Sequence, residues 1–233
     1  MKKSIIEKLF ISVTLASLLT SCGTTNDRIT GHYNEWNGIF VDSVVSGVYW
    51  KCGNAEGNTS LGGNFGPCIF EEPVTFSIGG LTLGTSVELS SHIFTPHNLI
   101  SGAKRDTTQN TTLQNDTIFK IASLLLSLDK DSNATNGIEI TSAVEESLTN
   151  NIATLFPTVS NRTIVKLSQS DIESIVSTIG TSFNNQSNTN ISYFNASIAS
   201  THLNRTVTEI TSGTIVEPDQ PLKVGGGEGG STF

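Results

Sequence analysis

The spacing of apolar residues changes once along this chain, and this change constrains the fold more than any other feature. In residues 74–84, VTFSIGGLTLG, apolar residues alternate with small polar ones on either side of a Gly-Gly pair, which predicts two short strands. From Thr117 onward, apolar residues instead recur three and four positions apart, as they do on one face of a helix. We therefore predict an α+β fold, with a small β-sandwich-like module over residues 37–85 and a module of about four helices over residues 117–210.

Four segments predict the helices. The first, residues 117–128, is apolar on nearly every side, so we expect a buried central helix. The other three carry apolar stripes with start and stop signals. These are Val144, Leu148 and Ile152 with a Ser142–Glu145 capping box and a stop at Pro157; Ile172, Ile175, Val176 and Ile179 with a Ser170–Glu173 capping box and a stop at Gly180; and Phe194, Ile198 and Leu203 in a helix within residues 190–207. Residues 86–116 are predicted to be a connector and residues 211–233 a flexible, Gly-rich tail.

The first 21 residues have the pattern of an export signal. Three Lys residues precede an apolar stretch, Leu9 to Leu19, that is too short for a lasting membrane span. The stretch ends in Leu-Thr-Ser-Cys, residues 19–22, which resembles the lipobox of bacterial lipoproteins. In a lipobox, small residues give the peptidase access and the Cys thiol takes a diacylglyceryl group. The alternative is an ordinary secretory signal that happens to carry a Cys.

The lipobox resemblance implies a location. The mature chain would begin at Cys22, carry palmitate-type acyl chains and follow a polar tether, residues 22–36, at the cell envelope. Gly23 follows the Cys, which in a Gram-negative host indicates the outer membrane, on its surface or periplasmic face. Without residues 1–21 the chain has ten basic and twenty acidic residues. This balance argues against a nucleic-acid partner and against contact with anionic headgroups, so the membrane would be reached through the lipid anchor.

Two further cysteines, Cys52 and Cys68, lie in the predicted β module. An even pair in an exported chain predicts a disulfide. Closing a loop of about 17 residues would stabilise the fold by roughly 3 kcal/mol. The alternatives are two free thiols or half of a metal site.

The β module and the segments after it resemble a known arrangement. The motifs that carry the resemblance are Asp42-Ser43, Gly47-Val48, Cys52, Asn58-Thr59, Gly63-Asn64-Phe65 and Gly80-Leu81-Thr82-Leu83-Gly84, then residues 118–140 and Ala199 to Thr206. In this order they resemble a module of bacterial surface lipoproteins and adhesin-like proteins. That group has no established biochemical activity, so the resemblance implies location and architecture, with little about mechanism.

The stretch LDKDSNATNGI, residues 128–138, allows two structural interpretations. Asp129, Asp131 and Asn133 stand at positions 1, 3 and 5 of an EF-hand-like spacing, with Thr135 at position 7 and Asn136 as a further tentative calcium ligand. The match then fails, because position 6 is an alanine and position 12 is an isoleucine, where the EF-hand needs Gly and Glu. The other interpretation is a polar stretch that ends a helix and starts a strand or turn. Asn136-Gly137 would form a left-handed corner, and Ile138 would re-enter the core.

A third interpretation of this stretch is glycosylation. Residues 131–135 fit the extended acidic sequon of some bacterial systems, and so do residues 56–60, which would make Asn133 and Asn58 acceptors. In a chain this rich in Asn, Ser and Thr, both matches can arise by chance.

No catalytic motif stands out. The four histidines, His32, His92, His97 and His202, show no metal-ligand spacing, and there is no G-x-S-x-G, P-loop or C-x-x-C. We predict no enzyme. A pocket that joins His92, His97 or His202 to a carboxylate would argue for one.

These patterns favour a non-catalytic, lipid-anchored envelope protein that presents a binding or adhesion surface to a protein or glycan. The alternative function is a periplasm-facing structural or assembly accessory of an outer-membrane complex. No cofactor is predicted, with calcium as the one possible ligand.

Overall fold

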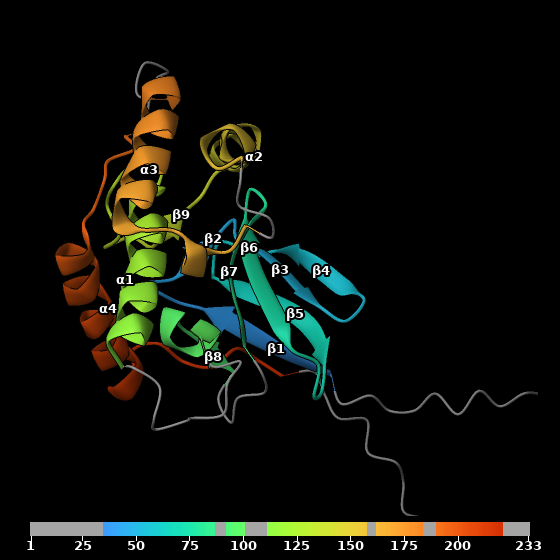
Figure 1. The fold of residues 1–233 in the computed structure, drawn as a ribbon. Helices are drawn as coiled ribbons and strands as arrows, with labels where there is room; N and C mark the ends of the chain where they lie inside the picture. The colour runs from blue at the N-terminus through green and yellow to red at the C-terminus, as the bar shows by residue number, and fades with distance from the viewer. Residues whose placement is uncertain (1–34, 87–91, 101–110, 158–161, 184–189, 221–233) are drawn as a thin grey trace, which may run out of the picture. The chain divides into compact units, whose positions relative to one another are not determined.

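The predicted change from strands to helices is confirmed (Figure 1). The computed structural model describes residues 35–86, 92–100, 111–157, 162–183 and 190–220, which all fall within one compact unit, Tyr33–Phe233. The predicted signal peptide, Cys22, His32 and the Gly-rich end of the tail lie outside the described residues. The elements are β1 (Glu35–Phe40), β2 (Val45–Ser46), β3 (Tyr49–Cys52), β4 (Ala55–Asn58), β5 (Asn64–Ile69), β6 (Val74–Ile78), β7 (Leu81–Ser86), β8 (Ile93–Phe94), η1 (Pro96–Ile100), α1 (Thr111–Ser127), β9 (Ile138–Glu139), α2 (Ser142–Leu155), η2 (Ile164–Lys166), α3 (Gln169–Phe183) and α4 (Ala196–Thr211).

Two sheets form the β module. One has the strand order β4-β3-β6-β7 and is antiparallel, and the other has the order β5-β1-β8, in which β8 runs parallel to β1. Aromatic rings join the two sheets, since Phe76 of β6 stacks on Phe40 of β1 with ring centroids 4.6 Å apart and meets Phe65 of β5 edge-on at 5.0 Å. The alternation predicted for β6 is also confirmed, because Val74, Phe76 and Ile78 are buried between less buried polar neighbours.

The predicted disulfide joins these two sheets. Cys52 ends β3 and Cys68 lies in β5, and their sulfur atoms are 2.01 Å apart. Both cysteines are buried in the same core as the aromatic rings. The bond therefore ties the sheets together across the core.

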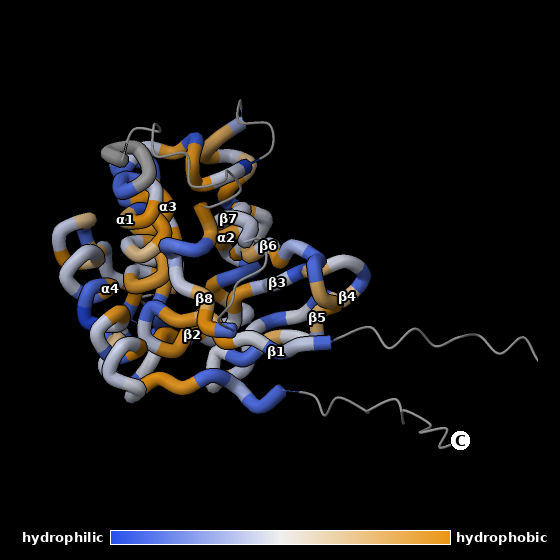
Figure 2. The backbone as a smooth tube through the Cα atoms, turned by 90° about the horizontal axis from the view of Figure 1, so that it is seen from below, coloured by the Kyte–Doolittle hydropathy of each residue, from blue (hydrophilic) through white to orange (hydrophobic). Residues whose placement is uncertain are grey.

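The β module and the helical module share one hydrophobic core. A single cluster of buried residues contains Phe40 and Phe76 from the strands and Leu124, Leu148 and Ile175 from the helices. Helix α1 contacts α3, α4 and η1 and is buried on almost every side from Thr117 to Leu128, as predicted. Figure 2 shows hydrophobic residues along α1 and α3.

A strand inside the helical region links the two modules. Ile138–Glu139 form β9, which pairs in parallel with β2, and the Ile138 amide donates to the Val44 carbonyl at 2.8 Å. The turn interpretation of residues 128–138 allowed a strand or a turn to follow, and the structure has a strand. Its two residues are too few to show a period of two, so the sequence could not distinguish the two outcomes.

The stripes predicted for α2 and α3 are confirmed. The stripe predicted for the last helix is confirmed only at Leu203, because Phe194 precedes α4 and Ile198 is exposed.

Both predicted capping boxes are wrong. Helix α2 is capped by Thr141, whose Oγ1 accepts from the Val144 amide at 3.3 Å. Ahead of α3, Ser168 accepts from the Asp171 amide at 3.2 Å, while its own amide donates to the Asp171 carboxylate at 2.7 Å. Thr141 was missed because Val144, and not Glu or Gln, stands three residues after it. Ser168 was missed because its partner is the shorter Asp171. Helix α3 also continues through Gly180 to Phe183.

The ends of the unit differ from prediction as well. Helix α1 begins at Thr111, inside the predicted connector. The tether was predicted to include Trp36, but β1 begins at Glu35, and Trp36 lies in that strand and stacks on Phe94. The predicted flexible tail is docked as far as Gln220, whose side chain accepts from the Asn37 amide at 3.1 Å and donates to the Asn37 carbonyl at 3.0 Å.

Candidate binding site between the Asp42 turn and the last helix

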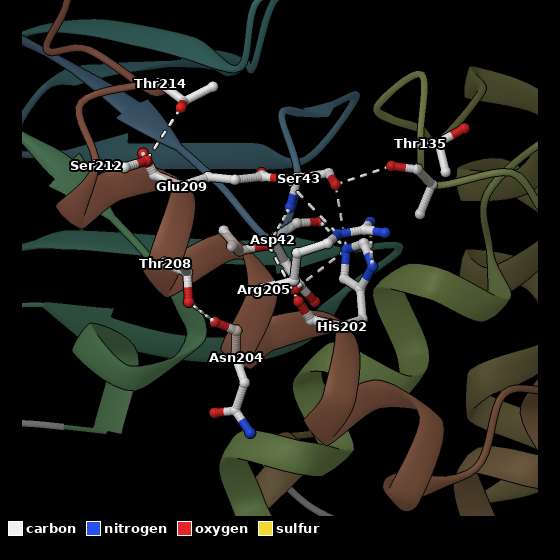
Figure 3. A network of polar contacts seen from close by, with 12 residues as sticks. Asp42, Ser43, Thr135, His202, Asn204, Arg205, Thr208, Glu209, Ser212 and Thr214 are labelled. Carbon is white, nitrogen blue, oxygen red and sulfur yellow. Dashed lines mark hydrogen bonds and ion pairs between the residues drawn. The ribbon is translucent and has the colours of Figure 1, made fainter.

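Three segments that are distant in sequence meet around Ser43 (Figure 3). Ser43 lies in the turn between β1 and β2; its amide donates to Thr206 Oγ1 of α4 at 3.0 Å, and its Oγ donates to the Ala134 carbonyl at 2.8 Å. Its φ of +56° is left-handed, which costs a non-Gly residue roughly 1–2 kcal/mol. The contacts on both sides hold the turn in this conformation, so the loop and α4 are fixed relative to each other.

His202 of α4 is the centre of the cluster. Its Nδ1 lies 3.0 Å from Arg205 Nη2, and a guanidinium can only donate, so we assign Nδ1 as the acceptor and place the ring proton on Nε2. Nε2 lies 3.2 Å from the Asp42 carbonyl and 3.2 Å from Ser43 Oγ, and both can accept its proton. Burial lowers the pKa of His202 and Arg205 lowers it further, against the hydrogen bond to the Asp42 backbone, which raises it.

The Asp42 carboxyl lies next to this imidazole. Its Oδ1 is 3.6 Å from His202 Nε2, and neither carboxyl oxygen has a hydrogen-bond partner, although both are buried. Burial raises the pKa of Asp42 well above its usual range, and the positive charge of Arg205 offsets this only in part. A proton on Asp42 avoids an unpaired buried charge, which would be costly.

Asp42, Ser43 and His202 have the residue types of a catalytic triad, but they lack its geometry. A triad needs one imidazole nitrogen to accept from the Ser hydroxyl and the other to donate to the carboxylate. Here Nε2 faces both Ser43 and Asp42, while Nδ1 is occupied by Arg205. Since the Ser43 proton goes to Ala134, His202 cannot take it without rearrangement. A His–carboxylate pair is therefore present, but it holds the segments together and does not activate a nucleophile.

A small cavity opens beside this cluster. It has a volume of about 210 Å³ and lies between the 132–135 loop and α4. Its apolar side comes from Leu126, Ala134, Phe194 and Ile198, and its polar side from Ser132, Asn133, Thr135, His202 and Arg205. Ile198 was predicted to face inward, but 48% of its surface is exposed. The helix turns this apolar side chain to the rim of the cavity, where a bound molecule could cover it.

The 129–136 loop beside the cavity satisfies its own acceptors. The two oxygens of the Asp129 carboxylate accept from the Asn133 amide at 2.8 Å and the Glu139 amide at 2.9 Å. Asp131 accepts from the Asn133 amide at 3.0 Å and from Asn136 Nδ2 at 2.9 Å. Asn133 Oδ1 accepts from Thr135 Oγ1 at 2.6 Å. Each tentative calcium ligand thus takes part in hydrogen bonds within the turn, so these bonds hold the turn without a cation.

Other features of this loop also favour the turn. Glu139 pairs with Lys130, and Gly137 has a φ of +97°, as the predicted left-handed corner requires. Within the described ranges, no group of three or more His, Cys, Asp or Glu is arranged to hold a metal. Burial raises the pKa of Asp129 to about 6, despite the opposing hydrogen bond from the Glu139 amide. Calcium binding stays a prediction that needs a direct test.

The other two described histidines lie apart from this cavity. His92 contacts Glu217 at 3.3 Å on the surface. His97 lines a separate hollow of about 350 Å³ with Ile93, Thr95, Asn98, Val207, Ile210 and Thr211, none of them acidic. Asn58 on β4 and Asn133 in the loop are both exposed, and their glycosylation stays a prediction.

The chain was compared with protein families, curated proteins and solved structures, and none of them matches. In the part of the chain that the structure describes, no helix combines the length and the apolar character that crossing a membrane requires.

Most residues of the site belong to motifs that the sequence analysis named, but nothing in the sequence indicated that these motifs form one site. Asp42-Ser43, the 129–138 stretch and residues 199–206 were separate motifs, and the structure brings them together. No local pattern could join Asp42 to His202, because they are 160 residues apart. Arg205 was missed for the same reason.

Proposed function

We propose that this protein is a lipid-anchored, non-catalytic binding protein of the bacterial cell envelope and that the cavity beside His202 is its binding site. The observation that supports a binding role is the set of hydrogen bonds made by His202. Its Nδ1 accepts from Arg205, while its Nε2 donates to the turn at Asp42. This network positions a cation at the rim of a cavity and leaves no free base for catalysis.

Two features support the location. The lipobox-like residues 19–22 supply a thiol for lipid attachment. The disulfide between Cys52 and Cys68 is the kind of bond that persists in oxidising compartments and is rare in a reducing cytosol. The resemblance to bacterial surface lipoproteins agrees with both features.

Location is tested with the full chain produced in a bacterial host fed radiolabelled palmitate. We expect label in the wild type and none in Cys22→Ala. We also expect protease added to intact cells to remove the protein. Label without protease cleavage would favour the periplasm-facing assembly role, and absence of label would refute the lipid anchor.

Binding is tested by the adhesion of cells that display the protein to a panel of immobilised glycans and proteins. Ile198→Lys places a charge at the cavity rim, and Val165→Lys is the matched control on another exposed apolar residue. We expect adhesion to be lost in the first variant and kept in the second. Equal adhesion of both variants would remove the cavity from the proposal, and hydrolysis of ester or glycoside substrates that His202→Ala abolishes would make the protein an enzyme.

A further inference from the structure

We propose that the cavity between the 132–135 loop and α4 binds an acidic sugar, with the sugar carboxylate on Arg205 and the ring against Phe194 and Ile198. This inference rests on the proposed binding function and names the chemical class of its ligand.

The charge of the cavity selects an anion. Arg205 is the only Lys, Arg, Asp or Glu among the nine residues that line the cavity, in a chain whose net charge is −8. The charged or titratable groups with contacts to it or to His202 are Asp42 from the β1–β2 turn and Glu209 from α4. Glu209 is 3.7 Å from Arg205 Nε, a loose pairing that leaves other guanidinium donors available. Because Arg donors match a carboxylate in a bidentate geometry, a carboxylate is the favoured anion.

Arg205 is held in place before any ligand arrives. Its Nη2 donates to His202 Nδ1, and His202 is itself fixed by the Asp42 carbonyl and Ser43. A guanidinium with a fixed orientation loses less conformational entropy on binding than a free one. This gives the buried network around Asp42 a function, because it positions Arg205 without touching the ligand.

The rest of the lining suits a ring with one apolar face. Phe194 is half-buried and Ile198 is largely exposed, so both present apolar surface at the cavity. The C–H face of a pyranose ring can pack against such surface. Opposite, Asn133 uses its Oδ1 to accept from Thr135, which leaves the amide N–H₂ to donate to a sugar oxygen. The volume of about 210 Å³ limits the ligand to one small group.

A peptide carboxylate is a poorer fit. A bound peptide usually pairs its backbone with free backbone groups of the protein. In the loop, the amides of Ser132, Asn133, Thr135 and Asn136 all donate within the loop itself. Side-chain groups therefore provide most of the polar contacts, and these suit hydroxyls and a carboxylate on a ring.

The test measures binding to the full chain in detergent by calorimetry and by saturation-transfer NMR. The probes are glucuronate, its neutral counterpart glucose, and the tripeptide Ala-Ala-Ala. Arg205→Gln removes the cation at an exposed position, and Lys51→Gln on β3 is the control that removes a cation from another exposed ion pair. Circular dichroism checks that both variants are folded.

We expect glucuronate to bind at least about tenfold more tightly than glucose or the tripeptide. Arg205→Gln should lose that tenfold preference, and Lys51→Gln should keep it. Equal binding of glucuronate and glucose, tighter binding of the tripeptide, no binding of any probe, or equal behaviour of the two variants would each overturn the acidic-sugar assignment. Adhesion that depends on Ile198 but is not inhibited by glucuronate would refute the ligand class while leaving the proposed function in place.

Discussion

The Oδ1 atom of Asp42 lies 3.6 Å from Nε2 of His202, and neither oxygen of this buried carboxyl has a hydrogen-bond partner. Burial acts on the two groups in opposite directions, since it raises the pKa of Asp42 and lowers that of His202. Both shifts favour the uncharged forms. The turn is thus held against α4 mainly by the contact between the His202 ring and the Asp42 backbone carbonyl. The Asp42 carboxyl itself lowers the stability of the fold at neutral pH.

Asp42→Asn is therefore expected to stabilise the protein at pH 7.5. A pKa raised in the folded state means that the stability from this group is present below the unfolded pKa of about 4 and is lost as the pH rises through the folded pKa. An amide of the same shape needs no proton to stay uncharged when it is buried, so we expect a gain of roughly 1–3 kcal/mol at pH 7.5 and little change at pH 4. Urea unfolding at both pH values measures this difference.

The exposed Asp219→Asn serves as the control for that experiment and should change neither value by more than about 0.5 kcal/mol. Loss of stability in Asp42→Asn at pH 7.5 would mean that an ionised Asp42 forms a productive ion pair with protonated His202.

Breaking the disulfide should destabilise the fold without changing the cavity beside His202. The bond joins residues 16 positions apart, so replacing both cysteines in a Cys52→Ala, Cys68→Ala variant is expected to lower the free energy of unfolding by about 3 kcal/mol. Dithiothreitol should lower the midpoint of the wild type and have no effect on the double variant. A reductant effect of similar size in the double variant would show that the disulfide is not its cause.

Replacing Asp129 distinguishes the two interpretations of residues 128–138, a polar turn and a calcium site. Asp129→Ala removes the acceptors for the Asn133 and Glu139 amides, so we expect a loss of roughly 2–4 kcal/mol with or without calcium. Because burial raises the pKa of Asp129 to about 6, its contribution to stability falls as the pH rises through that value, and the comparison belongs at pH 7.5, where the carboxyl is largely ionised.

The measurement is the thermal midpoint in EDTA and in 2 mM calcium, a concentration within the range of extracellular calcium sites, which bind at roughly 0.1–1 mM. If the stretch is only a turn, the thermal midpoint of the wild type should be the same in EDTA and in calcium. A rise of several degrees in calcium, absent in Asp129→Ala, would instead establish a calcium site.

Gly47 is expected to be far less tolerant of substitution than Gly80. Both have left-handed φ angles, +82° and +78°. A Cβ on Gly47 would lie 1.9 Å from the Ile140 carbonyl oxygen, whereas one on Gly80 would have no atom within 4 Å. Gly80→Ala should therefore cost about 1 kcal/mol from backbone strain alone, and Gly47→Ala should cost at least twice as much. Equal midpoints in urea unfolding would show that Gly47 does not lie in close contact with the Ile140 carbonyl.

Patterns that are local in the chain could be predicted well. The alternation around Phe76 and the stripe from Ile172 to Ile179 each follow from a period that a few neighbouring residues display, and both are confirmed. The cap positions were predicted less well, because Ser142 and Ser170 match the capping-box pattern and the residues that cap the helices, Thr141 and Ser168, do not. The hydrogen bonds in the structure show which residue caps each helix, and the residue types alone do not.

Residue types and short-range spacing were enough to predict the α+β class and the pairing of Cys52 with Cys68, and they offered the turn after α1 as one of several interpretations. That Asp42, the 132–135 loop and Arg205 form one site could be learned from the tertiary structure alone. Their meeting depends on β9 pairing with β2 and on α4 packing against α1. Contacts between residues 90 to 160 positions apart are products of the shared core, and no local period encodes them.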